Sequence, residues 1–290
     1  MANKLFIFGI GYSALALAEK CMERGWQVSG SVRSGNKAST LRAKGIRAFA
    51  YEGGNPSDEL INEVQSSPYI LQSIGLAEGK DPILPFFDSY IASRPRKWVG
   101  YLSTTVVYGN HDGALVDETT TPRPTTDRGK ARLAAENAWA QLPVPIHIFR
   151  LAGIYGQGRN ILLKMQQGKA RTIHKPNQVF SRIHVEDIAK LLLASMNAPA
   201  AKRGLPEIYN VADTESAAPE VVAAFAAELL GIKPPPLIPF EAAEMSEMAS
   251  SFYQDNKRVS SAKMLKLIGE FTYPTYREGL RAIKQSLHPR

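Results

Sequence analysis

KLFIFGIGYSA, at residues 4–14, runs an apolar strand directly into the pattern Gly9-x-Gly11-x-x-Ala14. The first glycine permits a tight turn, the second lets the backbone approach a phosphate without a Cβ in the way, and the small alanine lets a helix pack close to the strand. The N–H groups from about Tyr12 onward then face an anion with the positive end of the helix dipole behind them. The same pattern also occurs in ordinary glycine turns, but the strand before it favours a site for the pyrophosphate of a dinucleotide.

The hydrophobic pattern after this loop predicts the fold class. Helical spacing ends at Gly25, and residues 26–32 alternate as a second strand. Further apolar runs, separated by stretches long enough for crossover helices, occupy residues 46–51, 68–74, 98–103 and 146–154. Near-continuous apolar strands are typical of a parallel sheet covered on both faces. We therefore expect an α/β protein with a Rossmann-type doubly wound parallel sheet.

The later part of the chain is less regular and predicts a smaller C-terminal substrate lobe. It contains a strand at 207–212, a helix at 219–230, a proline-rich break at 233–239 and a closing segment through 273–283. Such a lobe suits the carboxyl ends of the strands, where ligands of these sheets bind. We expect an NAD(P)-binding domain at 1–155 that also receives parts of 180–215, and a region at 156–290 that is mainly the substrate-binding lobe.

Composition restricts the class of protein. The 290 residues carry a formal net charge of +8, but the basic residues are scattered, so we expect no nucleic acid partner. The single cysteine, Cys21, excludes an internal disulfide framework, points to a reducing compartment and is expected to be a buried hydrophobe. We expect no leader before the first strand, and no apolar run reaches the roughly 18 residues of a membrane span. These features predict a cytoplasmic protein with no membrane association.

The end of the second strand indicates which dinucleotide binds. A site for NAD usually has Asp or Glu there, whereas a site for NADP has a cation. Here the strand ends Ser31-Val32-Arg33-Ser34. The guanidinium of Arg33 and the hydroxyl of Ser34 therefore replace the carboxylate of an NAD site. The sequence favours NADP and leaves NAD possible. The alternative is that Arg33 is only a surface charge.

Three further motifs identify a family resemblance: LSTTVVYG at 102–109, RLAGIYGQGR at 150–159 and RIHVEDIA at 182–189. Together with the glycine pattern, they resemble the extended and atypical short-chain dehydrogenase/reductases, which include NAD(P)-dependent epimerases and dehydratases. The likeness covers nearly the whole chain. It implies a Rossmann fold and a nicotinamide cofactor.

The resemblance also implies a catalytic set, from which this chain departs. Members of the family use a Ser or Thr together with Tyr and Lys spaced Y-x-x-x-K, and Thr104 occupies the Ser/Thr position here. The tyrosine position holds Arg128 and the lysine position holds Arg132. Arginine keeps its proton at physiological pH, so Arg128 cannot easily replace the acid/base tyrosine, although Arg132 can still hold a ribose or a phosphate.

The candidate residues fall into three sets, and several have a structural alternative. The proposed catalytic set is Thr104, Tyr108, Arg128 and Arg132. The cofactor set is Gly9, Gly11, Tyr12, Ser13, Ala14, Arg33, Ser34, Ser73 and Arg132, and the substrate set is Tyr155, Arg159 and Arg182, with Lys175 as a further cation. Substitute proton donors are Tyr108, Tyr155, His184 and Asp187, each of which can instead be a packing residue or a helix-entry residue.

Two classes of function follow from these residues. The first is an NADP-dependent oxidoreductase or epimerase that acts on a nucleotide-sugar-like or other polar or anionic small molecule. The second is a regulatory protein that binds NADP(H) without turnover, which the missing tyrosine favours. Small residues on the helix at 128–140 and the family resemblance also suggest a homodimer, although a helix buried within one chain has the same pattern.

We predict that Arg33→Asp weakens NADPH binding at least tenfold, which corresponds to about 1.4 kcal/mol, because a carboxylate would face the 2′-phosphate. Calorimetric titration of the folded variant measures the change. An unchanged NADPH affinity would remove Arg33 from the cofactor site.

Overall fold

The computed structural model describes residues 2–198 and 205–287. The chain forms two compact units whose segments alternate along the sequence. Unit 1 comprises Met1–Thr104, Lys130–Arg150 and Ile188–Tyr209, and unit 2 comprises Thr105–Gly129, Leu151–Asp187 and Asn210–Arg290. The expected division at residue 155 stays a prediction about which part holds the cofactor and which part holds the substrate.

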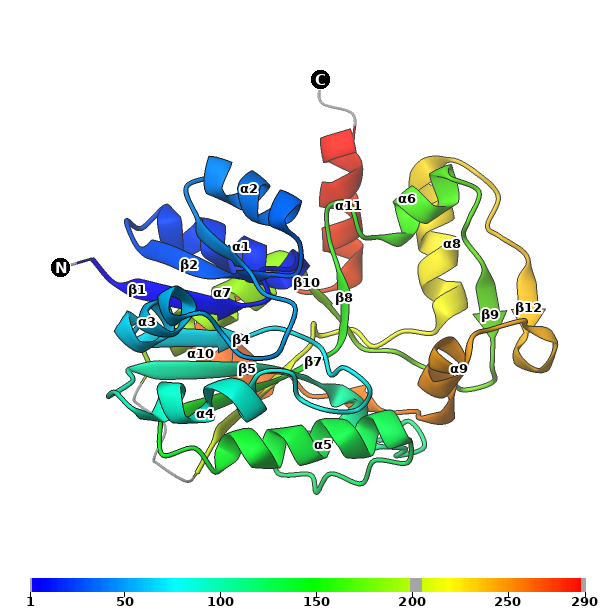
Figure 1. The fold of residues 1–290 in the computed structure, drawn as a ribbon. Coiled ribbons are helices and arrows are strands. Elements are labelled where there is room, and N and C mark those ends of the chain that lie inside the picture. Colours follow the sequence, from blue (N-terminus) through cyan, green and yellow to red (C-terminus); the bar gives the residue numbers. More distant parts are fainter. Residues whose placement is uncertain (1, 199–204, 288–290) are drawn as a thin grey trace. The chain divides into compact units, whose positions relative to one another are not determined.

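A seven-stranded sheet with the order β3-β2-β1-β4-β5-β7-β11 organises the fold, as the doubly wound pattern predicts (Figure 1). The pairs β1–β2, β2–β3, β1–β4 and β4–β5 are parallel. The strands are β1 (Lys4–Phe8), β2 (Gln27–Val32), β3 (Arg47–Ala50), β4 (Tyr69–Gln72), β5 (Trp98–Thr104), β7 (Ile146–Leu151) and β11 (Glu207–Val211).

One predicted strand is corrected by the structure. The apolar run at 146–154 is not one strand but two, β7 and β8 (Gly153–Tyr155). The break falls at Ala152, whose N–H donates to Val211 O, while β8 pairs with β10 (Arg182–His184) instead of continuing in the sheet. Hydrophobicity alone cannot reveal this change of partner because both strands are apolar.

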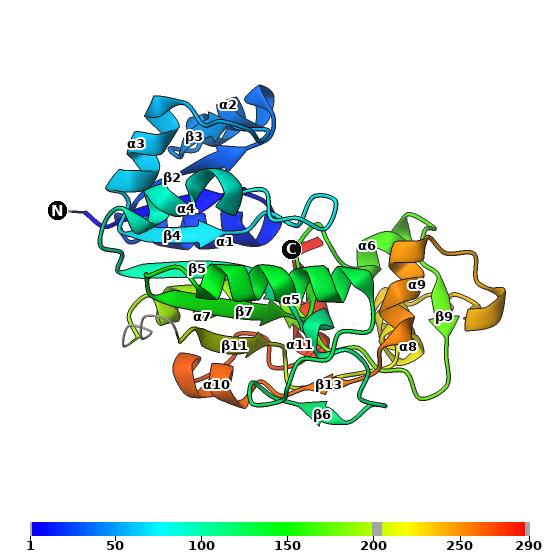
Figure 2. The same ribbon diagram turned by 60° about the horizontal axis from the view of Figure 1, so that its bottom comes forward.

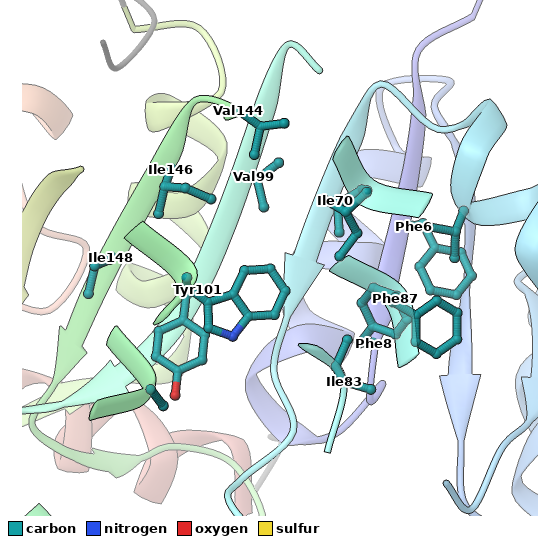
Figure 3. Close-up of a cluster of buried hydrophobic side chains, with 14 of the residues drawn as sticks. Phe6, Phe8, Ile70, Ile83, Phe87, Val99, Tyr101, Val144, Ile146 and Ile148 are labelled. Carbon is teal, nitrogen blue, oxygen red and sulfur yellow. The ribbon is translucent and has the colours of Figure 1, made fainter. Parts of the chain in front are cut away.

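Helices cover both faces of the sheet. Aromatic and aliphatic side chains of the sheet pack against α3 (Asp58–Ser66), α4 (Leu84–Ala92) and α5 (Asp127–Ala140), which Figure 2 shows on one face. Figure 3 shows this cluster, in which the rings of Phe6, Phe8 and Phe87 gather. Helices α1 (Tyr12–Met22) and α2 (Gly35–Ala43) follow β1 and β2, and α7 (Val185–Ser195) follows the short strand β10, which lies outside this sheet.

Unit 2 has a separate hydrophobic core. That core joins Tyr155 to the apolar faces of α6 (Ile161–Gln166), α8 (Pro219–Leu230) and α11 (Tyr276–Leu287). Helix α8 has the bounds that the sequence predicts. The described part of unit 2 also contains the short parallel strand pairs β8–β10, β9–β12 and β6–β13. The remaining elements are β6 (Leu115–Val116), β9 (Thr172–His174), β12 (Leu237–Pro239), β13 (Arg258–Val259), α9 (Glu247–Gln254), α10 (Ala262–Ile268) and the 3-10 turns Thr105–Tyr108 and Phe240–Ala242.

Unit 2 also buries a carboxyl group that the sequence analysis did not single out. Asp213 follows β11 and is only 2% exposed. Its N–H donates to Arg182 O (2.6 Å), and its Oδ1 accepts from Glu215 N (3.2 Å), whereas Oδ2 has no hydrogen-bond partner among the described residues. Burial raises the pKa of Asp213 to about 8, against the opposing influence of the bond from Glu215 and the charge of Arg182.

We predict that Gly30→Ala destabilises the fold by about 1–3 kcal/mol, the usual cost of overpacking. A Cβ at Gly30 would lie 2.3 Å from Ile7 O and 2.9 Å from Ile10 Cδ1, so β1 and the turn after it would have to shift. Urea unfolding measures the difference. The control is Gly35→Ala, where a Cβ meets nothing within 4 Å, and equal effects of the two substitutions would contradict this packing argument.

The raised pKa of Asp213 predicts a pH dependence of stability. A group whose pKa is higher in the folded than in the unfolded state stabilises the fold while it is protonated, and this contribution is lost as pH rises. The loss should extend from about pH 4, where an ordinary aspartate titrates, to about pH 8, the raised pKa of Asp213 in the fold. Asp213→Asn should therefore gain thermal stability over the wild type with rising pH in this window. Parallel Tm profiles of the two proteins would contradict the prediction.

Candidate functional site

The turn after β1 has the geometry that its glycines predict. Gly9 has φ +79°, in the left-handed region, and a Cβ there would lie 2.4 Å from Ile74 Cγ1. The N–H of Gly9 donates to Ser31 Oγ (3.2 Å), which ties the turn to the end of β2. A residue other than glycine would be both strained and obstructed at position 9.

Gly11 precedes the first turn of α1 and leaves open space above it. A Cβ at Gly11 would meet only Gly9 O, at 3.9 Å, and no side chain caps the helix. The first turn, which begins with Tyr12, carries no acidic residue, so the helix dipole is not compensated there. Ser13 and Ala14 are buried, and the small Ala14 permits the close packing of helix and strand. This cradle, which a Cβ would fill, fits the pyrophosphate of a dinucleotide.

A positively charged corner follows β2. The Arg33 side chain is exposed and makes no hydrogen bond or ion pair with other described residues. Ser34 caps α2, since its Oγ accepts from Lys37 N (3.3 Å). The first turn of α2 contains no acidic residue. An unpaired guanidinium beside a helix N-terminus suits a phosphate dianion better than ribose hydroxyls alone.

The ends of β4 and β5 supply two further predicted residues in unit 1. Ser73 N donates to Phe8 O (3.0 Å), which fixes the end of β4 beside the end of β1. Thr104 is the last residue of β5 and is half-buried. Ser73 follows the carboxyl end of β4, and Thr104 is the carboxyl-terminal residue of β5. This edge is where ligands bind in doubly wound sheets.

Arg132, at the family's lysine position, lies on α5 and is half-buried. Its Nη1 donates to Tyr101 Oη (2.8 Å), and its Cζ lies 5.8 Å from the centroid of the Tyr101 ring. Burial raises the pKa of Tyr101 to about 12 despite the nearby Arg132 charge, so the phenol stays neutral at physiological pH. Tyr101 could not be identified from the sequence, because no motif marks a tyrosine in the middle of a buried strand.

A buried ion pair fixes α5 against the sheet. Arg150 Nη2 lies 2.8 Å from Glu136 Oε2, with both side chains 3% exposed. Ser103 Oγ also donates to Glu136. Removing one member of such a pair leaves an uncompensated buried charge, so this cluster holds α5 firmly over β5 and β7.

Arg128, at the family's tyrosine position, belongs to unit 2. It is exposed, and its Cζ lies 5.0 Å from the centroid of the Phe252 ring on α9. Its guanidinium therefore stacks on an aromatic ring, and it has no proton to exchange in the physiological range.

The substitute proton donors are largely committed to packing in unit 2. Tyr108 is fully buried and donates to Asn210 Oδ1 (2.8 Å). Tyr155 donates to Thr275 O (3.3 Å) and packs on α11, where a Cβ at Gly279 would lie 2.3 Å from its Oη. Burial raises the pKa of Tyr155 well above its usual range. Both phenols are therefore buried within unit 2, which fits the packing alternative for these two residues.

His184 and Asp187 are also occupied. Burial lowers the pKa of His184 to about 4, and its Nδ1 accepts from Glu186 N (3.2 Å), so the imidazole is neutral at physiological pH. Asp187 accepts from the N–H groups of Thr272 and Tyr273 (2.7 and 3.0 Å). Asp187 thus accepts from backbone N–H groups of a distant segment that precedes α11.

The three cationic side chains proposed to bind substrate differ in how far they are already engaged by contacts within unit 2. Arg182 Nη1 donates to Phe180 O (2.8 Å) and Ala217 O (3.1 Å), so part of its guanidinium is used within unit 2. Lys175 donates to Tyr253 O and lies 5.2 Å from the Phe240 ring. Arg159 is exposed, in a turn closed by hydrogen bonds with Gly156.

Among residues 2–198 and 205–287, no three His, Cys, Asp or Glu side chains are grouped so that they could hold a metal ion. In the same ranges, no helix has both the length and the apolar character that a membrane span requires.

Known proteins resemble this chain over most of its length. Protein YeeZ of Escherichia coli strain K12 is 29% identical over 248 residues, which are 80% of this chain and 86% of YeeZ. A solved structure of a conserved protein of unknown function from Silicibacter pomeroyi DSS is 43% identical, covers 99% of both chains and has a TM-score of 0.88.

Two more distant structures share the fold. MoeE5, solved with UDP-glucuronic acid and NAD, is 17% identical with a TM-score of 0.76 and covers 98% of both chains. Human epimerase family protein SDR39U1, solved with NADPH, is 17% identical with a TM-score of 0.75 and covers 97% of this chain and 99% of its own. At this identity the likeness shows the fold alone.

The RmlD substrate binding domain family matches residues 90–288. This match extends from α4 to the C-terminal end and includes the motifs at 102–109, 150–159 and 182–189. The chain therefore belongs to the RmlD substrate binding domain family, within the short-chain dehydrogenase/reductases that its motifs resemble.

Proposed function

We propose that the protein binds NADP(H) through unit 1 and uses it in oxidoreductase or epimerase chemistry on a nucleotide-sugar-like or other polar substrate. The observation that carries this proposal is the open cradle at Gly11 together with the unpaired Arg33 after β2. The NADPH in SDR39U1 and the UDP-glucuronic acid in MoeE5 support the two ligand classes.

Each part of the dinucleotide has a proposed set of residues in this chain. Gly9, Gly11 and the first N–H groups of α1 would hold the pyrophosphate, with Ser13 and Ala14 keeping the helix close. Arg33 and Ser34 would hold the 2′-phosphate, because a guanidinium recognises a phosphate through two parallel hydrogen bonds. Ser73 and Arg132 are assigned to the remainder of the cofactor.

When bound, the nicotinamide supplies or accepts a hydride. We assign Thr104 to polarise the reacting oxygen of the substrate, and Arg159 to attract an anionic substrate group because its side chain is exposed. Neither Arg128 nor Arg132 can provide the proton, because a guanidinium stays charged. Proton transfer is therefore the step in which this protein should differ most from relatives with a Y-x-x-x-K pair.

The second candidate is NADP(H) sensing without turnover. It is favoured by the same arginine pair and by the internal hydrogen bonds that occupy Tyr108 and Tyr155. Both candidates share the cofactor site and differ only in chemistry, so a turnover assay separates them.

We also propose a homodimer through α5. The exposed side chains on this helix include Ala134, Asn137 and Ala138, whereas Ala135 and Trp139 are buried in the core of unit 1. A face of small exposed residues permits close helix packing, and the family resemblance points to the same helix.

We predict that Arg128→Tyr combined with Arg132→Lys introduces or raises NADPH-dependent carbonyl reduction. A lysine one turn away would lower the pKa of the new phenol, and acid–base catalysis of this kind contributes about 10²–10⁴-fold. The assay follows the loss of NADPH absorbance with UDP-sugar and simple carbonyl substrates, and Arg128→Tyr alone is the matched control. If the double variant binds NADPH but gains no rate over that control, the lost pair does not by itself limit activity and the pocket has diverged.

A further inference from the structure

The half-buried Arg132 has no acidic partner among the described residues. Its one hydrogen bond in the part of the chain that the structure describes is to Tyr101 Oη, and no Asp or Glu there forms an ion pair with it. A guanidinium has five N–H donors, so four are left for another partner. Because the phenol is neutral, the positive charge of Arg132 is not compensated by its neighbour.

Tyr101 is fixed by a chain of contacts within unit 1. The side chain is fully buried, and its ring stacks on Trp139 of α5, with centroids 5.6 Å apart and an interplanar angle of 24°. Trp139 Nε1 donates to Asp81 Oδ2 (2.8 Å). Asp81 Oδ1 in turn accepts from the N–H groups of Ile83 and Leu84 (2.8 and 3.0 Å) at the start of α4. These contacts leave the phenol little freedom to move.

The strand order indicates which part of a dinucleotide lies on this side. A doubly wound sheet binds its two nucleotides on either side of the strand where the order reverses. Here that strand is β1, with β2 and Arg33 on one side and β4 and β5 on the other. Tyr101 is on β5, three residues before the carboxyl-end residue Thr104. In Figure 3 its hydroxyl oxygen lies at the end of the ring nearest the strand arrowheads.

We propose that Tyr101 is the positioning residue that holds the Arg132 guanidinium in place to bind the nicotinamide-bearing nucleotide, the part of the cofactor to which Arg132 is already assigned. Trp139 and Asp81 support Tyr101 from behind. This inference rests on the proposed NADP(H) binding and assigns to a phenol–guanidinium pair the half of the cofactor that Gly9, Gly11 and Arg33 do not reach.

The test compares NADPH with 2′,5′-ADP, which contains only the nucleotide assigned to the β2 side. Calorimetry should show that Tyr101→Phe weakens NADPH binding about tenfold, as expected for losing a hydrogen bond that orients a charged group. The affinity for 2′,5′-ADP should stay within about twofold of the wild type. Tyr69→Phe, which removes a buried phenol from the neighbouring strand β4, is the matched control and should change neither affinity.

The outcomes distinguish failure of the positioning role of Tyr101 from failure of the proposed NADP(H) binding. If Tyr101→Phe lowers both affinities equally, or neither, while its Tm matches that of Tyr69→Phe, Tyr101 does not position a nucleotide-binding arginine. If the wild-type protein binds neither NADPH nor 2′,5′-ADP, the proposed function itself fails. Selective loss of NADPH affinity supports both.

Discussion

The left-handed turn at Gly9 is the constraint on which the rest of unit 1 depends. It lets the chain leave β1 beside Ile74 and start α1 at once, and the bond from Gly9 N to Ser31 Oγ holds it against β2. As a result, the N-terminus of α1 and the exposed Arg33 stand after neighbouring strands. Helix dipole, open backbone and guanidinium all favour a polyanion, and that agreement between three independent features supports the cofactor assignment.

Much of the sheet could be predicted because its strands are apolar and, at four to seven residues, longer than the short strands of unit 2. The short strands of unit 2 could not, since runs of two or three residues, such as Arg258–Val259, have no detectable period. The break at Ala152 was missed for a related reason, because a change of pairing partner leaves hydrophobicity unchanged. Local pattern identifies an element, but tertiary pairing decides where it ends.

In the candidate site, too, features encoded by local sequence could be predicted, whereas features that depend on tertiary contacts could not. The glycine loop and Arg33 could be identified because backbone geometry and charge sign are encoded locally. The Tyr101–Arg132 bond could not, since its two residues are 31 positions apart and the motif that marks Arg132 does not include Tyr101. Burial likewise changes roles that composition suggests: Tyr155 is a phenol at a strand end in the sequence but a packed, hydrogen-bonded side chain in unit 2.

The central claim is that the glycine loop and Arg33 together form an NADP(H) site. Parallel calorimetric titration of the purified wild-type protein with NADPH and NADH, after mass spectrometry has excluded carried-over nucleotide, tests it most directly. The account predicts clearly tighter binding of NADPH, because only NADPH offers Arg33 a phosphate. Equal affinities, tighter binding of NADH, or binding of neither nucleotide would contradict it.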